Sequence, residues 1–172
     1  MTANFDRFTL RPLSSEEGLL FRTLRLRALA DSPTAFGTTL EAQQARAERE
    51  WIERAQIVAN DPTQQILLAF FEDEPCAMAH SYIDSKDAEL AHVGAMWVDP
   101  ARRGYGLAQM ILQQSTAWAE AKGATRIELW VTEGNTAAIR LYERAGYVDT
   151  GARRPLPSHP TLLILEMRRT LR

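Results

Sequence analysis

The sequence predicts a single α/β domain, and three observations support this prediction. Its 172 residues are enough for one domain with one sizeable core. Hydrophobic residues make up 45% of the chain and charged residues 24%, which is the composition of a globular protein rather than a disordered one. Helix-like and strand-like patterns alternate, and no internal repeat or linker divides the chain. We therefore expect residues 1–172 to form one domain.

The first half of the chain predicts two helices and three strands. A strand is expected at Phe5–Leu13. Ser14–Glu17 has the pattern of a capping box, and the helix that it opens ends before Pro33, because proline disfavours helical geometry in the preceding residue. A second helix is expected over Glu41–Gln56, which is rich in helix formers. Two strands flank a hairpin turn at 72–75, namely Gln65–Phe71 and Cys76–Ile83.

The second half predicts a buried central strand followed by alternating helices and strands. Leu90–Val98 is the apolar central strand, and Pro100 ends it. A helix is expected from Leu107 to Ala121, with Gly123 as its C-terminal cap. The later elements are a strand at Arg126–Val131, a helix at Asn135–Ala145, and strands at Tyr147–Gly151 and Leu162–Met167, joined by a proline-containing stretch at Arg153–Pro160.

Composition excludes several classes of partner and site. The net charge is −2, so no basic surface for nucleic acid is expected. Cys76 is the one cysteine, and the histidines lack ligand spacing, so neither an internal disulfide nor a metal site is expected. The N-terminus has no secretory pattern, and the longest apolar run, 66–71, is too short to cross a membrane. A cytoplasmic protein without membrane partners is expected.

Two glycines stand between the central strand and the next helix, in Arg103-Gly104-Tyr105-Gly106. A helix N-terminus presents free amides and a partial positive charge that bind phosphate, and glycine lets the phosphate approach the backbone. Arg102 and Arg103 are able to add charged contacts. A dinucleotide-binding fingerprint would need glycine where Gln109 stands, and the lysine of a Walker loop is missing. A structural glycine-rich turn remains the alternative.

A second motif follows the next strand. It runs Asn135-x-x-Ala138-x-x-Leu141-Tyr142-x-x-x-Gly146-Tyr147. Together with the earlier Arg103-x-x-Gly106-x-Ala108, in this order and with a helix and a strand between, it resembles the GNAT superfamily of N-acetyltransferases. The resemblance implies a mixed, mostly antiparallel sheet of about six to seven strands, splayed between the fourth and fifth strands and flanked by about four helices.

The same resemblance implies an acetyl-CoA-dependent N-acetyltransferase. An acetyl group would pass to a primary amine by direct attack in a ternary complex, with acetyl-CoA as co-substrate, no metal, and a possible homodimer. Two alternatives from other classes are a non-catalytic acyl-CoA-binding sensor and a nucleotide-binding domain. The residues that the resemblance assigns to acetyl-CoA are Met96, Trp97, Val98, Arg103, Gly104, Tyr105, Gly106, Leu107, Ala108, Asn135 and Tyr142.

The chemistry of aminolysis suggests roles for individual side chains. Tyr142 is expected to protonate the departing thiolate, and its alternative role is to fill the core. Asn135 either contacts the co-substrate or caps the helix that follows it. His92 is the first candidate for the base, because alternation places it on the face of Gly94, Met96 and Val98; a buried neutral histidine is the alternative. Other candidates for the base are Glu89, Glu133, His80 and His159.

The acceptor is expected to bind along the segment Asp31–Leu40, which in the family helps to form the acceptor groove. Phe36 in this segment would be a wall of the acceptor pocket or an anchor for the loop. The identity of the acceptor amine does not follow from the sequence.

Overall fold

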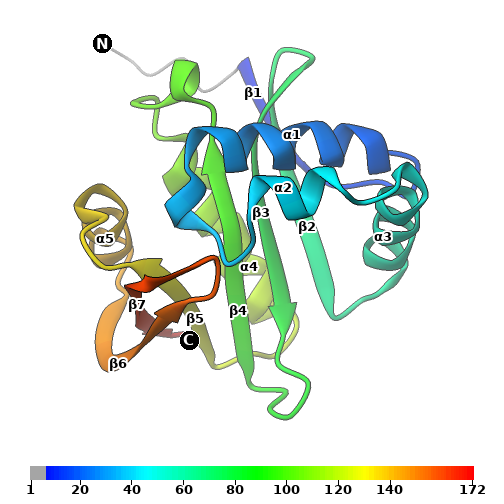
Figure 1. Ribbon diagram of the computed structural model, residues 1–172. Helices are drawn as coiled ribbons and strands as arrows, with labels where there is room; N and C mark the ends of the chain where they lie inside the picture. Colours follow the sequence, from blue (N-terminus) through cyan, green and yellow to red (C-terminus); the bar gives the residue numbers. More distant parts are fainter. Residues whose placement is uncertain (1–6) are drawn as a thin grey trace.

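The computed structural model describes residues 7–172, in which seven strands form one sheet. The strand order is β1-β2-β3-β4-β5-β7-β6, and only β4 and β5 pair in parallel (Figure 1). The expected mixed, mostly antiparallel sheet is thereby confirmed. The strands are β1 (Phe8–Pro12), β2 (Gln64–Phe71), β3 (Glu74–Ile83), β4 (Leu90–Val98), β5 (Arg126–Thr132), β6 (Val148–Leu156) and β7 (His159–Thr170).

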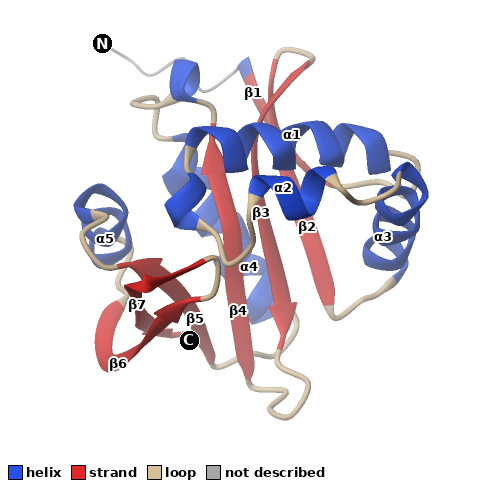
Figure 2. Ribbon diagram, viewed as in Figure 1, coloured by secondary structure: helices blue, strands red, loops and turns tan. Residues whose placement is uncertain are grey.

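Helices cover both faces of this sheet (Figure 2). The five α-helices of the described residues are α1 (Gly18–Asp31), α2 (Leu40–Gln44), α3 (Glu48–Asn60), α4 (Leu107–Ala121) and α5 (Thr136–Arg144). The first three lie over one face, and α4 lies behind the sheet. Two single turns of 3₁₀ helix, η2 (Pro33–Ala35) and η3 (Pro100–Arg102), precede α2 and α4. In residues 7–172, none of the helices is long and apolar enough to cross a membrane.

Each face of the sheet has its own hydrophobic core. Leu107, Ile111 and Leu112 of α4 are buried against one face, in a core that also contains Tyr142 of α5. On the other face α1 packs against α3, where the rings of Phe21 and Trp51 lie 5.6 Å apart in an edge-to-face arrangement. These helices approach so closely that a Cβ on Gly18 would lie 2.6 Å from the Cα of Ile52, so this position requires glycine.

Several predicted boundaries agree with the structure and others are wrong. The central strand at Leu90–Val98 and the helix at Leu107–Ala121 are confirmed. The predicted helix Glu41–Gln56 is two helices, because Thr39 caps α2 and the Glu50 carboxylate accepts a hydrogen bond from the Ala47 amide at the start of α3. Of the predicted strand Phe5–Leu13, residues 5 and 6 lie outside the described residues. The Ser14–Glu17 box is half present, since Glu17 accepts from the Ser14 amide at 2.9 Å but the Ser14 side chain does not cap α1.

The largest difference is at the end of the chain. The stretch Arg153–Pro160 was expected to join two short strands, but most of it belongs to β6 and β7, which pair as one long hairpin. Pro155 is tolerated because β6 is an edge strand with one side unpaired. This hairpin reaches the segment between α1 and α2: the Ser158 hydroxyl donates a hydrogen bond to the Phe36 carbonyl at 2.5 Å. The hairpin thereby holds the segment that contains Phe36, which lines the candidate site.

Candidate active site

The sheet splits between β4 and β5. These two parallel strands pair only at Leu90–His92 with Arg126–Glu128, after which they diverge. A cavity of about 360 Å³ opens beside the split, lined by residues 93–98 of β4, residues 129–132 of β5, and one side of α5. Phe36 from the segment between α1 and α2 closes part of it. The predicted splay between the fourth and fifth strands is therefore present, and it contains a space large enough for a ligand.

Most of the residues predicted to contact acetyl-CoA line this cavity. They are Met96, Trp97, Val98, Arg103, Ala108, Asn135 and Tyr142. Gly104, Tyr105, Gly106 and Leu107 do not line it; they form the turn that joins Arg103 to Ala108, and the Leu107 side chain is buried in the core. A ligand lying in the split and continuing to this turn would meet all of the predicted residues.

A bulge at Ala95 reverses the faces of β4. Ala95 has a φ of +50°, and the pairing with β3 shifts between His80 opposite Gly94 and Met78 opposite Trp97. The extra residue turns the side chains of Met96 and Val98 toward the α4 core and that of Trp97 toward the α1 core. Simple alternation places His92 on the face of Met96 and Val98. In the structure it instead lies on the face of Gly94 and Trp97. That prediction is wrong because alternation fails across a bulge.

The turn before α4 has the backbone of an anion-binding loop. Gly104 and Gly106 have φ values of +85° and +78°, which favour glycine. A Cβ on Gly104 would meet nothing within 4 Å, so the space beside it is open. Helix α4 begins at Leu107 without a side-chain cap, and its first amides lack partners within the helix. A diphosphate placed here would accept hydrogen bonds from these amides and would interact favourably with the helix dipole.

The two arginines of this turn have other contacts. The Arg103 Nε donates to the Val98 carbonyl at 3.0 Å, and its guanidinium also forms an ion pair with Asp31. Asp31 also accepts from the Trp97 indole at 2.9 Å. The Arg102 guanidinium lies 3.9 Å over the ring of Phe71. Arg103 therefore fixes the end of β4 next to α1, and the amides of the turn are better placed than these side chains to bind an anion.

Tyr142 brings a phenol to the cavity from α5. The residue is 8% exposed and lines the cavity, with its ring 6.1 Å from that of Tyr147. Burial raises the pKa of its hydroxyl well above its usual value, so the phenol keeps its proton at neutral pH. The ring of Tyr142 packs in the core, and the residue also lines the cavity.

Asn135 contacts both α5 and the cavity. Its side-chain oxygen accepts a hydrogen bond from the Ala138 amide at 3.3 Å, which caps α5, and the residue also lines the cavity. The capping bond uses the amide oxygen and leaves the amide NH₂ as a donor for a ligand.

His92 is held at the apex of the split by aromatic and acidic neighbours. Its Nε2 lies 3.0 Å from a carboxylate oxygen of Asp84, and its ring stacks on Tyr82 with centroids 4.8 Å apart. Its Nδ1 is 4.0 Å from a carboxylate oxygen of Glu128. His92 does not line the cavity but lies directly before it, one residue from Val93. An Nε2–H donated to Asp84 would leave the Nδ1 lone pair available to accept a proton.

Glu128 is a residue that the sequence analysis missed. It is 4% exposed, and Arg168 of β7 binds its carboxylate through Nε at 2.5 Å. A charged residue between Ile127 and Leu129 was the available signal, because both neighbours are buried on the opposite face. The carboxylate lies on the same side of the sheet as His92.

The other candidates for the base lie in different surroundings. His80 is bonded to Gln64 at 3.2 Å, and burial, with nearby Arg54 and Arg25, lowers its pKa to about 4. His159 lies 3.0 Å from the Ser158 hydroxyl in the β6–β7 turn. Glu133 binds Arg153 at 3.4 Å, and Glu89 is exposed before the paired end of β4. Only His92 combines a position beside the split with two neighbouring carboxylates.

Comparisons with known proteins agree with this geometry. A model of the "Acetyltransferase (GNAT) family" matches residues 26–147. The chain is 31% identical over 139 residues to a mycothiol acetyltransferase of Thermobispora bispora, covering 81% of this chain and 45% of that protein. The chain thus spans about half the length of the curated relatives that it matches.

Solved structures share the fold. An acetyltransferase of the GNAT family from Streptococcus pneumoniae has a TM-score of 0.79 at 20% identity, covering 96% of this chain and 99% of its own. A putative acetyltransferase from Salmonella typhimurium, solved with its cofactor acetyl-CoA, has a TM-score of 0.75 at 17% identity, with 96% and 94% of the two chains covered.

Proposed function

The chain belongs to the acetyltransferase (GNAT) family, and on that premise we propose that it transfers an acetyl group from acetyl-CoA to a primary amine by direct attack in a ternary complex. The observation that carries the proposal is the cavity in the split of the sheet, which extends from Phe36 past β4 to Tyr142 and adjoins the uncapped start of α4. A thioester and an amine need such a shared space in order to react without a covalent acetyl-enzyme.

The residues present fit acetyl-CoA as co-substrate. The amides at the start of α4 suit its diphosphate, and the open space at Gly104 lets that group approach. Beyond His92, β4 has no pairing with β5, so backbone groups of Met96 to Val98 are available to a chain-like amide ligand in the split. Further support is that the Salmonella typhimurium relative in fold was solved with acetyl-CoA.

Two side chains of this protein would handle the protons. His92 takes a proton from the acceptor ammonium, directly or through water, while Asp84 and Glu128 stabilise the imidazolium that results. The amine nitrogen then forms a bond to the acetyl carbon as the carbon–sulfur bond breaks. Tyr142, which keeps its phenolic proton, donates it to the departing sulfur. A backbone N–H of β4 directed at the carbonyl oxygen would contribute about 10²–10³ in rate.

We also propose that residues 1–172 act as one N-acetyltransferase domain. Support comes from the sheet, because β1, which starts at Phe8, and β7, which ends at Thr170, belong to the same sheet.

The experiment that tests this function measures thiol release from acetyl-CoA with the purified protein and a panel of primary amines. We expect release above the background rate with at least one amine, together with a mass increase of one acetyl group on that amine. Calorimetry with CoA separates the alternatives. Binding without thiol release would indicate an acyl-CoA sensor, and the absence of binding would contradict the whole assignment.

A further inference from the structure

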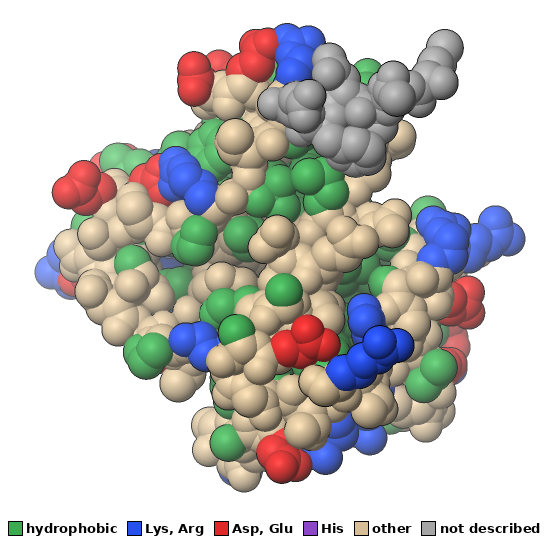
Figure 3. All heavy atoms as spheres, turned by 180° about the vertical axis from the view of Figure 1, so that it is seen from behind, with side chains coloured by type: hydrophobic (Ala, Val, Ile, Leu, Met, Phe, Trp, Pro, Cys, Tyr) green, Lys and Arg blue, Asp and Glu red, His purple; other side chains and the backbone are tan. Residues whose placement is uncertain are grey.

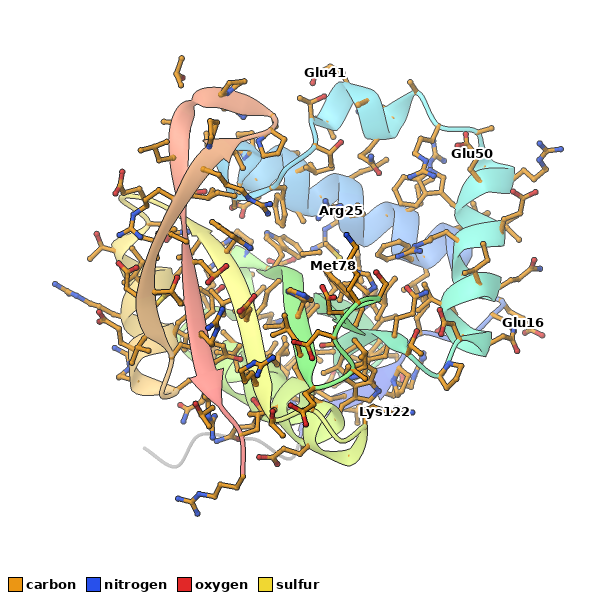
Figure 4. The ribbon with its side chains drawn as sticks, turned by 90° about the horizontal axis from the view of Figure 1, so that it is seen from below. Glu16, Arg25, Glu41, Glu50, Met78 and Lys122 are labelled. Atoms are coloured by element: carbon orange, nitrogen blue, oxygen red, sulfur yellow. The ribbon has the colours of Figure 1, made fainter. Side chains whose placement is uncertain are left out.

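Arg25 of α1 is a partly buried cation that forms no ion pair within residues 7–172. Its guanidinium lies under α1 and points toward the sheet next to Met78 of β3 (Figure 4). Among residues 7–172, no carboxylate comes within ion-pair distance of it, and its Nη1 is buried without a hydrogen-bond partner. Burial alone lowers its pKa to about 10. A charge placed in this way is unfavourable in the free protein, because the cost of desolvation is not offset by an anion.

The position of Arg25 connects it to the candidate site. Its guanidinium lies 4.5 Å over the ring of Phe36, which lines the cavity. It also lowers the pKa of His80, which pairs directly across the sheet with Gly94, another lining residue. Arg25 therefore contacts one lining residue, Phe36, directly and lies near a second, Gly94, through His80.

A second cation, Arg54, also lies near His80. Arg54 of α3 has Nη2 3.5 Å from the His80 Nε2, and within the described part of the chain it forms no ion pair. In contrast, the carboxylates of this face lie at its other end, where Asp84 and Glu128 flank His92. Between the two ends the rings of His80, Tyr82 and His92 follow one another with centroids 5.2 and 4.8 Å apart. We call the face of the sheet that carries His80, Tyr82 and His92 the acceptor face. It has cations without ion-pair partners among the described residues at one end and the proposed base at the other.

We propose that Arg25, with Arg54 beside it, binds a carboxylate of the acceptor, so that the acceptor is an amine that also carries a carboxylate group, such as an amino acid. This inference rests on the proposed function. The planar guanidinium matches a carboxylate, and an anion would supply the partner that the buried Nη1 lacks. The same contact would fix the acceptor so that its nitrogen points toward the split and His92.

Matched pairs of amines test this inference. Phenylalanine is compared with phenylethylamine and lysine with cadaverine, so that each pair differs by one carboxylate, and kcat/KM is measured from thiol release. We expect the carboxylated member to be preferred by about 10- to 100-fold, which is the range of one charge-assisted hydrogen bond. Arg25→Met should remove this preference, mainly through KM, and Arg25→Lys should retain part of it. Arg49→Met is the control, because Arg49 is exposed on α3, where it forms an ion pair with Glu53.

Stability separates a binding role from a structural one. Replacing a partly buried unpaired cation by methionine should leave Tm unchanged or raise it. A lower Tm with an unchanged acceptor preference would mean that Arg25 only supports Phe36, and would overturn the proposal.

Binding measurements keep the inference independent of turnover. N-acetylphenylalanine and N-acetylphenylethylamine are titrated by calorimetry into the CoA-saturated protein and into Arg25→Met. We expect the carboxylated probe to bind more tightly, and only when Arg25 is present. Equal use of both members of each amine pair would overturn this inference while the proposed acetyl transfer stands. If none of the four amines is acetylated, equal or absent binding of the two probes overturns it. Absence of CoA binding would contradict the proposed function, and the probes would still report on Arg25.

Discussion

His92 of β4 lies directly opposite Glu128 of β5, and this is the last pair of residues at which the two parallel strands are joined. Beyond it the strands diverge around the cavity. The Nδ1 of His92 is 4.0 Å from the Glu128 carboxylate. The sheet therefore places His92, next to a buried carboxylate, at the point where the two strands separate.

Replacing His92 by glutamine should lower kcat without changing the affinity for acetyl-CoA. The loss expected for a general base is about 10²–10⁴-fold at neutral pH. Activity should recover as the pH rises toward the pKa of the acceptor amine, near 10.4 for a lysine-like amine, because free amine then forms without a base. The measurement is kcat as a function of pH. His159→Gln is the control, since His159 begins β7 beside Ser158; equal kcat in His92→Gln and wild type would contradict the assignment.

Tyr142→Phe should also lower kcat and leave the binding of acetyl-CoA intact, because the ring that packs in the core is retained while the proton donor is lost. Single-turnover rates and calorimetry measure the two effects separately. Tyr147→Phe is a matched control: its hydroxyl is buried without a hydrogen-bond partner and the residue does not line the cavity. If both variants had the same kcat as the wild type, Tyr142 would be only a core aromatic.

Local patterns were sufficient to predict the elements around the candidate site. The apolar run Leu90–Val98 followed by Pro100 predicted β4, and the helical spacing from Leu107 predicted α4, because each signal lies within its own segment. The positions of Asn135 and Tyr142 at the cavity agree with the motif on which the resemblance was based.

What the sequence did not predict depends on contacts between distant segments. The bulge at Ala95 is visible only in the register with β3. It reverses the faces of the residues that follow it, so that Met96 and Val98 lie on the opposite face from His92. The role of Glu128 depends on Arg168, 40 residues away in the chain. The lack of a partner for Arg25 is likewise a property of the folded protein, and in the printed sequence Arg25 is one of many arginines.

The distribution of surface charge also had to come from the structure. Seen from behind, basic and acidic side chains are interspersed over the molecule (Figure 3). The net charge of −2 is an average over such a surface, and it does not reveal the unpaired cations on the acceptor face. Overall charge is therefore a poor guide to the acceptor, whereas the pairing of individual arginines is informative.

Gly106→Ala should weaken the binding of CoA. Gly106 directly precedes the first amides of α4, and a residue with φ of +78° is strained by about 1–2 kcal/mol when it is not glycine. Gly123→Ala provides the matched control, because Gly123 follows the other end of the same helix with φ of +86° and open space around its Cβ position. Both variants should lose similar stability, and only Gly106→Ala should lose CoA affinity in calorimetry. Equal CoA affinity in the two variants would place the diphosphate elsewhere.

His80 should make the stability of the fold fall as the pH drops from about 6.5 toward 4. Burial, with Arg54 and Arg25 nearby, lowers its pKa from 6.5 to about 4, so between these values the unfolded chain binds a proton that the folded protein does not. The corresponding loss is about 3 kcal/mol in the free energy of unfolding, complete near pH 4. Urea unfolding at a series of pH values measures it.

His80→Gln identifies the source of that slope. Glutamine does not titrate, so the variant should lose less stability than the wild type between pH 6.5 and 4, and the two curves should run parallel below pH 4. There the loss continues in both proteins, because a hydrogen bond from Arg11 lowers the pKa of Glu17 to about 2, and its favourable charged form disappears only as the pH falls through that value. Parallel curves over the whole range would instead mean that the pKa of His80 is the same in the folded and the unfolded chain, so that the folded protein would gain a positive charge there below about pH 6.5.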